Sequence, residues 1–222
     1  MKATASVKLS IERPPKHVID GFKELATTAI ADFLKLESVV RHTIGPLWTP
    51  IPRIAGPAFT VRTARHDNLM LHAAIYHAEA GDVIVVEAGD EEMAVAGGNV
   101  CAVAQRRGVA GLVVDGVVRD VGESRANGFP LHARGRSPIP AGKDGPGDIG
   151  VLVVCGGARV HPGDVVVADE EGIVIVPKAR AEGLLREALA RAAKDAAESL
   201  DDWERRHRAR VESTLRARGY LT

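Results

Sequence analysis

The stretch that decides the fold is GGNVCAVAQRRGVAGLVVDGVVRDVGE, residues 97–123. Its first part has helical character, and Gly108 stands at the position where helices commonly end. GLVVDG, residues 111–116, is largely apolar and lacks the polar alternation of a half-exposed strand, as is typical of a strand buried on both faces. The stretch therefore predicts a helix over residues 93–107, then a buried strand, with an Arg-Asp pair shortly after that strand.

The same kind of pattern extends outward on both sides. Apolar residues recur at helical spacing early in the chain, and VIVVEAG reads as another buried strand. Four prolines within residues 43–57 predict a loop. Helices are predicted at 17–36, 68–80, 93–107 and 120–127, and strands at 58–62, 83–89, 111–116, 129–135, 150–157, 164–169 and 172–177. Because helices and strands alternate early and strands dominate later, we expect an α/β core with an additional β layer.

The end of the chain has a different composition, rich in Ala, Arg and Glu from Ala179 to about Arg216. An apolar stripe at helical spacing predicts one long amphipathic helix there. Its members are Leu185, Leu189, Ala192, Ala196, Leu200 and Trp203. The stripe needs a partner, either a neighbouring subunit or the chain's own domain. We expect an N-terminal arm (1–16), an α/β catalytic domain (17–178) and a C-terminal helical extension (179–222).

Composition and charge exclude several classes of protein. The 222 residues suit one domain with an extension, or at most two small domains. Lys plus Arg and Asp plus Glu both number 29, so the net charge is 29 − 29 = 0, which does not indicate a nucleic-acid partner. The two cysteines form no CxxC or Cys/His pattern for zinc. Without a signal peptide or a long apolar run, the sequence predicts a cytoplasmic protein that does not span a membrane.

The glycine pair at the start of the decisive stretch predicts an anion site. Gly97 and Gly98 allow a ligand to approach the backbone closely. They stand at a helix N-terminus, where the N–H groups of Asn99, Val100 and Cys101 are expected to be free and to face an anion. A carboxylate has the right size for such a site.

The charged pair that follows the buried strand adds a cation and a metal ligand. Arg119 offers a planar fork for a carboxylate or enolate oxygen. Asp120 offers a hard oxygen ligand for Mg²⁺ or Mn²⁺. The residues alone leave open the alternative of a plain turn and a surface ion pair. The stretch has neither the G-x-G-x-x-G pattern of dinucleotide sites nor the GK[ST] of a Walker loop.

The spacing of these residues matches a family motif. Gly98 is followed by twenty residues and then by Arg119-Asp120, with a further acid at Glu123. Residues 67–89 and 143–177 agree as well, so the likeness covers about residues 20–180. The chain resembles the 4-hydroxy-4-methyl-2-oxoglutarate and 4-carboxy-4-hydroxy-2-oxoadipate aldolases. Many of these are also oxaloacetate decarboxylases, and they share a fold with the regulator of ribonuclease activity A.

The resemblance implies a swivelling β/β/α fold, a small 2-keto acid as substrate, and homotrimers or homohexamers with sites between subunits. It implies that Arg119 binds the keto oxygen and stabilises the enolate. It implies that Asp120 anchors Mg²⁺, partly through water, with Mn²⁺ or Co²⁺ as substitutes. The pyruvyl carboxylate would be held, largely by backbone N–H groups, at Gly97, Gly98, Asn99 and Val100.

The expected function is that of a metal-dependent lyase. It would cleave a 4-hydroxy-2-keto diacid or triacid to pyruvate and a 2-keto acid, or decarboxylate oxaloacetate, as in the catabolism of aromatic compounds. The alternative is a non-catalytic regulator that binds a ribonuclease or another protein. That branch tends to lose the Asp after the Arg, so Asp120 favours the enzyme. Some aldolases carry an acid where this chain has Gly98, so metal affinity or substrate choice is expected to differ.

Other polar residues receive weaker assignments. Candidates for the acid from a neighbouring subunit are Asp195 and Glu198, and candidates for binding a second substrate carboxylate are Arg62, Arg65 and Arg125. The histidines at 66, 72, 77 and 132 are expected to serve as capping or core residues. Lys143 lies in a glycine-rich loop, and the metal site makes it unnecessary as a Schiff-base nucleophile.

Overall fold

The computed structural model describes residues 6–221, and within them the centre of the molecule is an eight-stranded sheet. Seven strands follow one another across the sheet in the order β1-β5-β4-β3-β2-β9-β10, and β6 pairs with β2 off this path. They are β1 (Gly45–Pro46), β2 (Ile54–Thr63), β3 (Val83–Glu87), β4 (Gly111–Val118), β5 (Leu131–Arg136), β6 (Gly147–Ile149), β9 (Val165–Asp169) and β10 (Gly172–Val176). A separate hairpin joins β7 (Val153–Cys155) and β8 (Ala158–Val160).

The sheet has a parallel half and an antiparallel half. Strands β2, β3, β4 and β5 run parallel, and β3 and β4 are buried on both faces, as their apolar runs predicted. The other pairings are antiparallel: β2 with β6 and β9, β9 with β10, and β1 with β5. The expected α/β core with an additional β layer is therefore confirmed.

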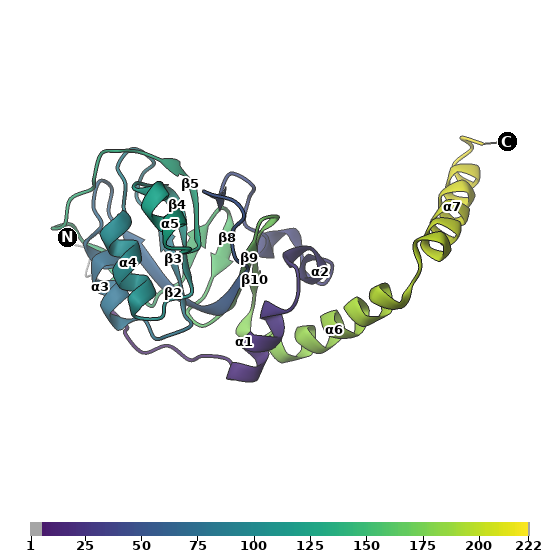
Figure 1. Cartoon of the computed structure of the whole chain (residues 1–222), viewed down its shortest axis with the longest axis horizontal. Helices are drawn as coiled ribbons and strands as arrows, with labels where there is room; N and C mark the ends of the chain where they lie inside the picture. Colours follow the sequence, from purple (N-terminus) through teal and green to yellow (C-terminus); the bar gives the residue numbers. More distant parts are fainter. Residues whose placement is uncertain (1–5, 222) are drawn as a thin grey trace.

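Helices cover the parallel half on one face, where α3 (Leu69–His77), α4 (Gly98–Arg106) and α5 (Val121–Ala126) lie together (Figure 1). Their buried side chains form one core with the strands, and the hairpin β7–β8 packs on the opposite face in a second core. A third core joins β9 and β10 to the short helices α1 (Lys16–Lys23) and α2 (Thr27–Ala31) and to α6 (Ala181–Ala197).

Several predicted boundaries were wrong, and the strand expected over residues 150–157 is only Val153–Cys155. The single helix expected over residues 17–36 is divided into α1, α2 and a 3₁₀ turn at Leu36–Ser38. Strand β2 begins at Ile54, inside the predicted proline loop, because its first residues pair with β9. Helix α4 begins only at Gly98, because the residues before it are extended and bond to other segments, as when Val95 N–H donates to the Val117 carbonyl.

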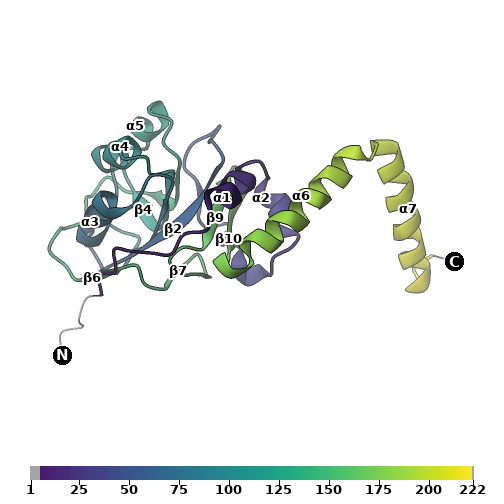
Figure 2. The ribbon, with the colours of Figure 1, turned by 90° about the horizontal axis from the view of Figure 1, so that it is seen from below.

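The predicted long C-terminal helix is two helices, α6 and α7 (Leu200–Ala217). Ser199 begins α7 by accepting a hydrogen bond from Asp202 N–H at 3.1 Å, so the chain turns between the two helices. The first half of α6 packs on its own domain, and a Cβ on Gly21 of α1 would lie 2.6 Å from Leu185. No residue of α7 is buried, and it extends away from the body (Figures 1 and 2).

The first turns of α6 belong to the third core, whereas α7 has no buried residue. The predicted division into a catalytic domain and a C-terminal helical extension stays a prediction. Within residues 6–221, no helix combines the length and the apolar character that are needed to cross a membrane.

Candidate active site

The end of β4 and the start of α4 lie against each other. Arg119 N–H donates to the Ala96 carbonyl at 2.9 Å, and Gly98 N–H donates to Asp120 Oδ2 at 3.0 Å. Asp120 adopts a left-handed backbone conformation with φ of 56°, which is uncommon for a residue with a side chain. This conformation turns its carboxylate toward the first turn of α4, whose positive dipole end favours a negative charge.

The glycine pair leaves room for these charged groups. A Cβ on Gly97 would lie 2.7 Å from Asp120 Oδ2 and 3.0 Å from Arg119 Nε. A Cβ on Gly98 would overlap the carboxylate of Glu123. The glycine pair was predicted to let a ligand approach the backbone closely. In the structure, the side chains of Arg119, Asp120 and Glu123 approach it. The space that an acid at position 98 would need is thus occupied by the acid at position 123.

All six residues predicted to bind the substrate or the metal line one cavity of about 260 Å³. They are Gly97, Gly98, Asn99, Val100, Arg119 and Asp120. The side chains of Arg119 and Asp120 are 42% and 38% exposed, so both remain accessible to a ligand, and Arg119 Nε lies 3.5 Å from Asp120 Oδ2. The structure brings these residues together, while their roles in binding and catalysis stay predictions.

The predicted anion site has fewer free N–H donors than the sequence suggested. Cys101 N–H donates to the Gly97 carbonyl at 3.0 Å, and Gly98 N–H is taken by Asp120. The expected free N–H of Cys101 was therefore wrong. The donors left for an anion in the first turn of α4 are the N–H groups of Asn99 and Val100.

A further part of the lining, called the second wall below, comes from parts of the chain that sequence reasoning left aside. It is formed by Asn68 and His72 on the first turn of α3 and by Pro140 and Lys143 in the loop after β5. Asn68 and His72 are four residues apart, which places them on one helix face. That spacing was the available signal for this pair, whereas the sequence around Lys143 offered only a charge in a glycine-rich loop.

The environment of His72 favours its neutral form. Its pKa is lowered mainly by burial and further by the positive charge of Lys143, although Asp67 opposes this shift. The Arg and Lys residues that line the cavity are Arg119 and Lys143.

Asp67 holds the Lys143 loop in place. Its buried carboxylate accepts hydrogen bonds from the N–H groups of Asp144 and Gly145 through Oδ2, and from Leu69 N–H through Oδ1, each at 2.8 Å. Burial alone would raise the pKa of this carboxyl, but the three backbone donors bring the pKa below its usual value. A charged Asp67 thus fastens the loop to the start of α3.

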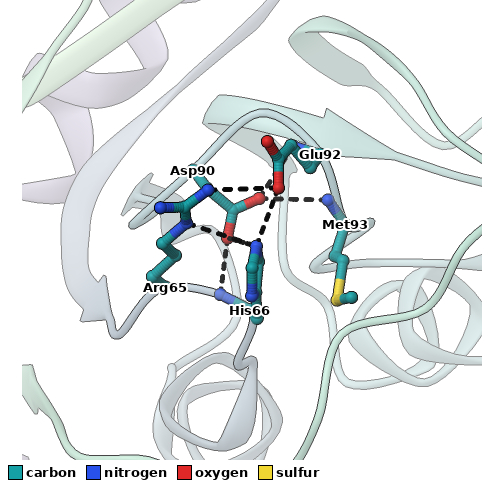
Figure 3. A network of polar contacts seen from close by, with 5 residues as sticks. All are labelled: Arg65, His66, Asp90, Glu92 and Met93. Atoms are coloured by element: carbon teal, nitrogen blue, oxygen red, sulfur yellow. Dashed lines mark hydrogen bonds and ion pairs between the residues drawn. The ribbon is translucent and has the colours of Figure 1, made fainter.

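A second polar network joins the segment before α3 to the segment after β3 (Figure 3). Asp90 accepts hydrogen bonds from His66, Glu92 and Met93 N–H groups, and His66 Nε2 lies 2.9 Å from Glu92 Oε2. His66 also has a left-handed backbone, and its carbonyl accepts a hydrogen bond from Gly142 N–H at 2.8 Å. The network therefore ties the segment that leads to the glycine pair to the Lys143 loop.

The remaining candidates lie outside the cavity. Arg62 pairs with Glu87 and Asp148, and Arg65 pairs with Glu92. Arg125, Asp195, Glu198, His66, His77 and His132 do not line the cavity either. The two thiols are buried, and burial raises the pKa of Cys101 to about 11. A larger groove of about 900 Å³ near α2 contains none of the predicted site residues.

The residues present are compatible with Mg²⁺ but do not form a complete protein cage. Within residues 6–221 no group of three His, Cys, Asp or Glu side chains is arranged to hold a metal ion. Asp120 and Glu123, however, bring two carboxylates to the same glycine pair. Mg²⁺ is usually bound by one or two carboxylates, with water and substrate oxygens completing the shell. This donor set fits that pattern.

Comparison with known proteins identifies the family. Residues 27–175 match the model of the family described as RraA-like, Aldolase/RraA. A protein from Halalkalibacterium halodurans, provisionally named a 4-hydroxy-4-methyl-2-oxoglutarate aldolase, is 39% identical over 204 residues, which cover 91% of this chain and 93% of that protein. One from Burkholderia multivorans with the same provisional name is 37% identical over 156 residues, covering 68% and 94%. The chain therefore belongs to the RraA-like (Aldolase/RraA) family.

Solved structures agree on the fold. Streptomyces coelicolor RraAS2, described as an unusual member of the RNase ES inhibitor RraA protein family, matches with a TM-score of 0.76 and 28% identity over 84% of this chain and 98% of that chain. The RNA-processing inhibitor RraA from Thermus thermophilus matches with a TM-score of 0.63 and 30% identity over 69% and 93%. The predicted fold of the ribonuclease-activity-regulator type is confirmed. The family holds both named aldolases and named inhibitors.

Proposed function

We propose that this chain is a divalent-metal-dependent lyase that breaks a carbon–carbon bond in a 2-keto acid and leaves pyruvate. Its substrates would be aldols of the 4-hydroxy-4-methyl-2-oxoglutarate or 4-carboxy-4-hydroxy-2-oxoadipate type, as in aromatic catabolism, and oxaloacetate. The observation that carries the proposal is the single cavity in which free helix N–H groups, the Arg119 cation and the Asp120 carboxylate meet. A purely structural role does not require that combination.

Each side chain has a physical task in the proposed reaction. The N–H groups of Asn99 and Val100 bind the 2-keto acid by its carboxylate at the positive end of α4. Arg119 donates to the keto oxygen, where negative charge grows as the enolate forms, and this interaction is stronger in the transition state than in the bound substrate. Lys143, which lines the same cavity, binds the far carboxylate of the substrate.

The same arrangement serves two reactions. In the retro-aldol, the C3–C4 bond breaks, the 4-hydroxyl gives its proton to solvent water and becomes a carbonyl, and the bond electrons form the pyruvate enolate. In decarboxylation of oxaloacetate, the bond to the C4 carboxylate breaks, CO₂ leaves, and the same enolate remains. In both cases a proton at C3 then completes pyruvate.

Asp120, helped by Glu123, would hold Mg²⁺, with Mn²⁺ or Co²⁺ as substitutes. When bound, such an ion supplies Lewis-acid stabilisation of the enolate charge. We also propose that the enzyme works in the cytoplasm as a homotrimer or homohexamer with sites between subunits. Helix α7, which buries none of its residues within residues 6–221, supports an assembly.

The proposal is tested by measuring pyruvate release from oxaloacetate with and without Mg²⁺, Mn²⁺ or Co²⁺. We compare the wild type with Asp120→Asn, which keeps an acceptor for Gly98 N–H but removes the charge. Asp201→Asn on α7 is the matched control. We expect metal-dependent activity that falls about 10²- to 10³-fold in Asp120→Asn alone, the scale of one lost electrostatic group in an active site.

A second candidate function is regulation of RNA processing through a protein partner, which the descriptions of the two solved relatives favour. A folded wild type that releases no pyruvate from oxaloacetate or either aldol with any of the three metals contradicts the lyase proposal. Binding of the metal-free chain to a purified ribonuclease, unchanged by Asp120→Asn, would then support the regulator.

A further inference from the structure

The side chain of Asn68 has one oxygen without a partner. Asn68 is 4% exposed and stands just before α3 on the wall of the cavity. Its Nδ2 donates to the Val95 carbonyl at 3.1 Å, and this bond fixes which end of the amide is nitrogen. The other end, Oδ1, is buried and has no hydrogen-bond partner among the described residues.

Buried side-chain acceptors normally have partners, so an exception calls for a physical reason. Four such atoms occur within residues 6–221, and they are Thr63 Oγ1, Asn68 Oδ1, Ser124 Oγ and His132 Nδ1. Of these four residues only Asn68 lines the cavity. The partner of its oxygen is therefore best sought in the ligand.

The chemistry of the cavity limits what that partner can be. Its charged donors, Arg119 and Lys143, and its free backbone N–H groups all suit carboxylate and keto oxygens. An amide oxygen only accepts hydrogen bonds, so it needs a donor on the ligand. Ionised 2-keto acids have carboxylate and keto oxygens that only accept. In the proposed aldol substrates the 4-hydroxyl is the group that donates, and keto oxaloacetate lacks it.

We propose that Asn68 Oδ1 accepts a hydrogen bond from the 4-hydroxyl of the aldol substrate and thereby selects aldols over oxaloacetate. The inference rests on the proposed lyase function and deepens it. Asn68 is a substrate-binding residue here, since a neutral amide oxygen does not take the hydroxyl proton. A site that binds a substrate hydroxyl discriminates strongly against a substrate without it, because the polar group of the site is then left unpaired.

The experiment compares kcat/KM for 4-hydroxy-4-methyl-2-oxoglutarate and for oxaloacetate in three proteins. They are the wild type, Asn68→Leu, and the control Thr63→Val, which removes a buried unpartnered oxygen outside the cavity. We expect Asn68→Leu to lower the aldol-to-oxaloacetate ratio of kcat/KM by about 10- to 100-fold. Thr63→Val should leave the ratio unchanged. General damage to the Val95 segment would lower both activities and not their ratio.

A binding measurement tests the hydroxyl itself. 4-Methyl-2-oxoglutarate has the same skeleton without the hydroxyl, and its inhibition constant should be nearly the same in the wild type and in Asn68→Leu. Asn68→Ala replaces the Leu variant if circular dichroism shows that the latter is unfolded. An unchanged ratio, or equal weakening of the hydroxylated and deoxy compounds, overturns the inference and indicates that Lys143 or water partners Asn68. A wild type inactive on both substrates overturns the lyase proposal itself.

Discussion

The two walls of the cavity differ in how the chain builds them. The first wall, Gly97–Val100 with Arg119 and Asp120, lies within a single helix-and-strand unit, and its backbone atoms hold its charged groups. The second wall joins Asn68 and His72 to a loop about seventy residues further along the chain, and the carboxylate of Asp67 makes the connection. A wall encoded locally carries the proposed chemistry, whereas a wall assembled from distant segments is suited to recognising the rest of the substrate.

The largest expected effect is on the first wall. Arg119→Ala removes the cation that faces the enolate oxygen, so we expect kcat for oxaloacetate decarboxylation to fall about 10³-fold with little change in KM. Arg119→Lys keeps the charge but loses the planar fork and should recover only part of that loss. Steady-state kinetics with saturating Mg²⁺ measures both.

Arg125→Ala is the matched control, since Arg125 is close in sequence but does not line the cavity. If Arg119→Ala instead raised KM and left kcat unchanged, the residue would bind the ground state and transition state equally. The first wall would then recognise the substrate as the second wall does, and the contrast between them would fail.

The difference between the walls explains what the sequence revealed. The run of residues 111–116 identified a buried strand, and Gly98 with Arg119-Asp120 identified the site that follows it. Both signals depend on local backbone geometry, which short patterns encode. The predicted helix began too early, at residue 93, because the residues before Gly98 form hydrogen bonds with β4 and with the loop after β5. Such long-range partners leave no periodic pattern in the sequence.

The second wall could not be predicted for the same reason. His72 and Lys143 line the same cavity because β6 pairs with β2 and because Asp67 binds the loop between β5 and β6. The division of the C-terminal helix was also missed, although Ser199 followed by Asp202 is an N-cap signal within the residues themselves. Its apolar stripe continued past the turn and concealed the boundary.

Asp67 gives the next largest effect. Asp67→Ala leaves three partly buried N–H groups without their charged acceptor, and we expect a loss of about 2 kcal/mol in the free energy of unfolding. KM for aldols should rise more than kcat falls, because the Lys143 loop loses its anchor. Urea denaturation and steady-state kinetics measure the two effects, and the exposed Asp144→Ala, which keeps its backbone N–H, is the control.

The pH dependence of this contribution follows from the lowered pKa of Asp67. The folded protein binds the proton less readily than the unfolded chain, so the stabilisation is fully present above the unfolded pKa and is lost as the pH falls through the folded pKa. The difference in stability between wild type and Asp67→Ala should therefore shrink in acid. A difference that stays constant down to acid denaturation would show that Asp67 acts through packing alone.

The smallest effect concerns His72. Burial and, next, Lys143 lower the pKa of His72, which favours its neutral form, and His72→Gln should change kcat/KM less than about threefold between pH 7 and 8. In Lys143→Met the repulsion is removed, so the pKa of His72 should rise, as NMR titration of its ring protons would show. The reverse shift, or a steep pH dependence that disappears in His72→Gln, would make His72 a proton-transfer group. The second wall would then take part in the chemistry and not only in recognition.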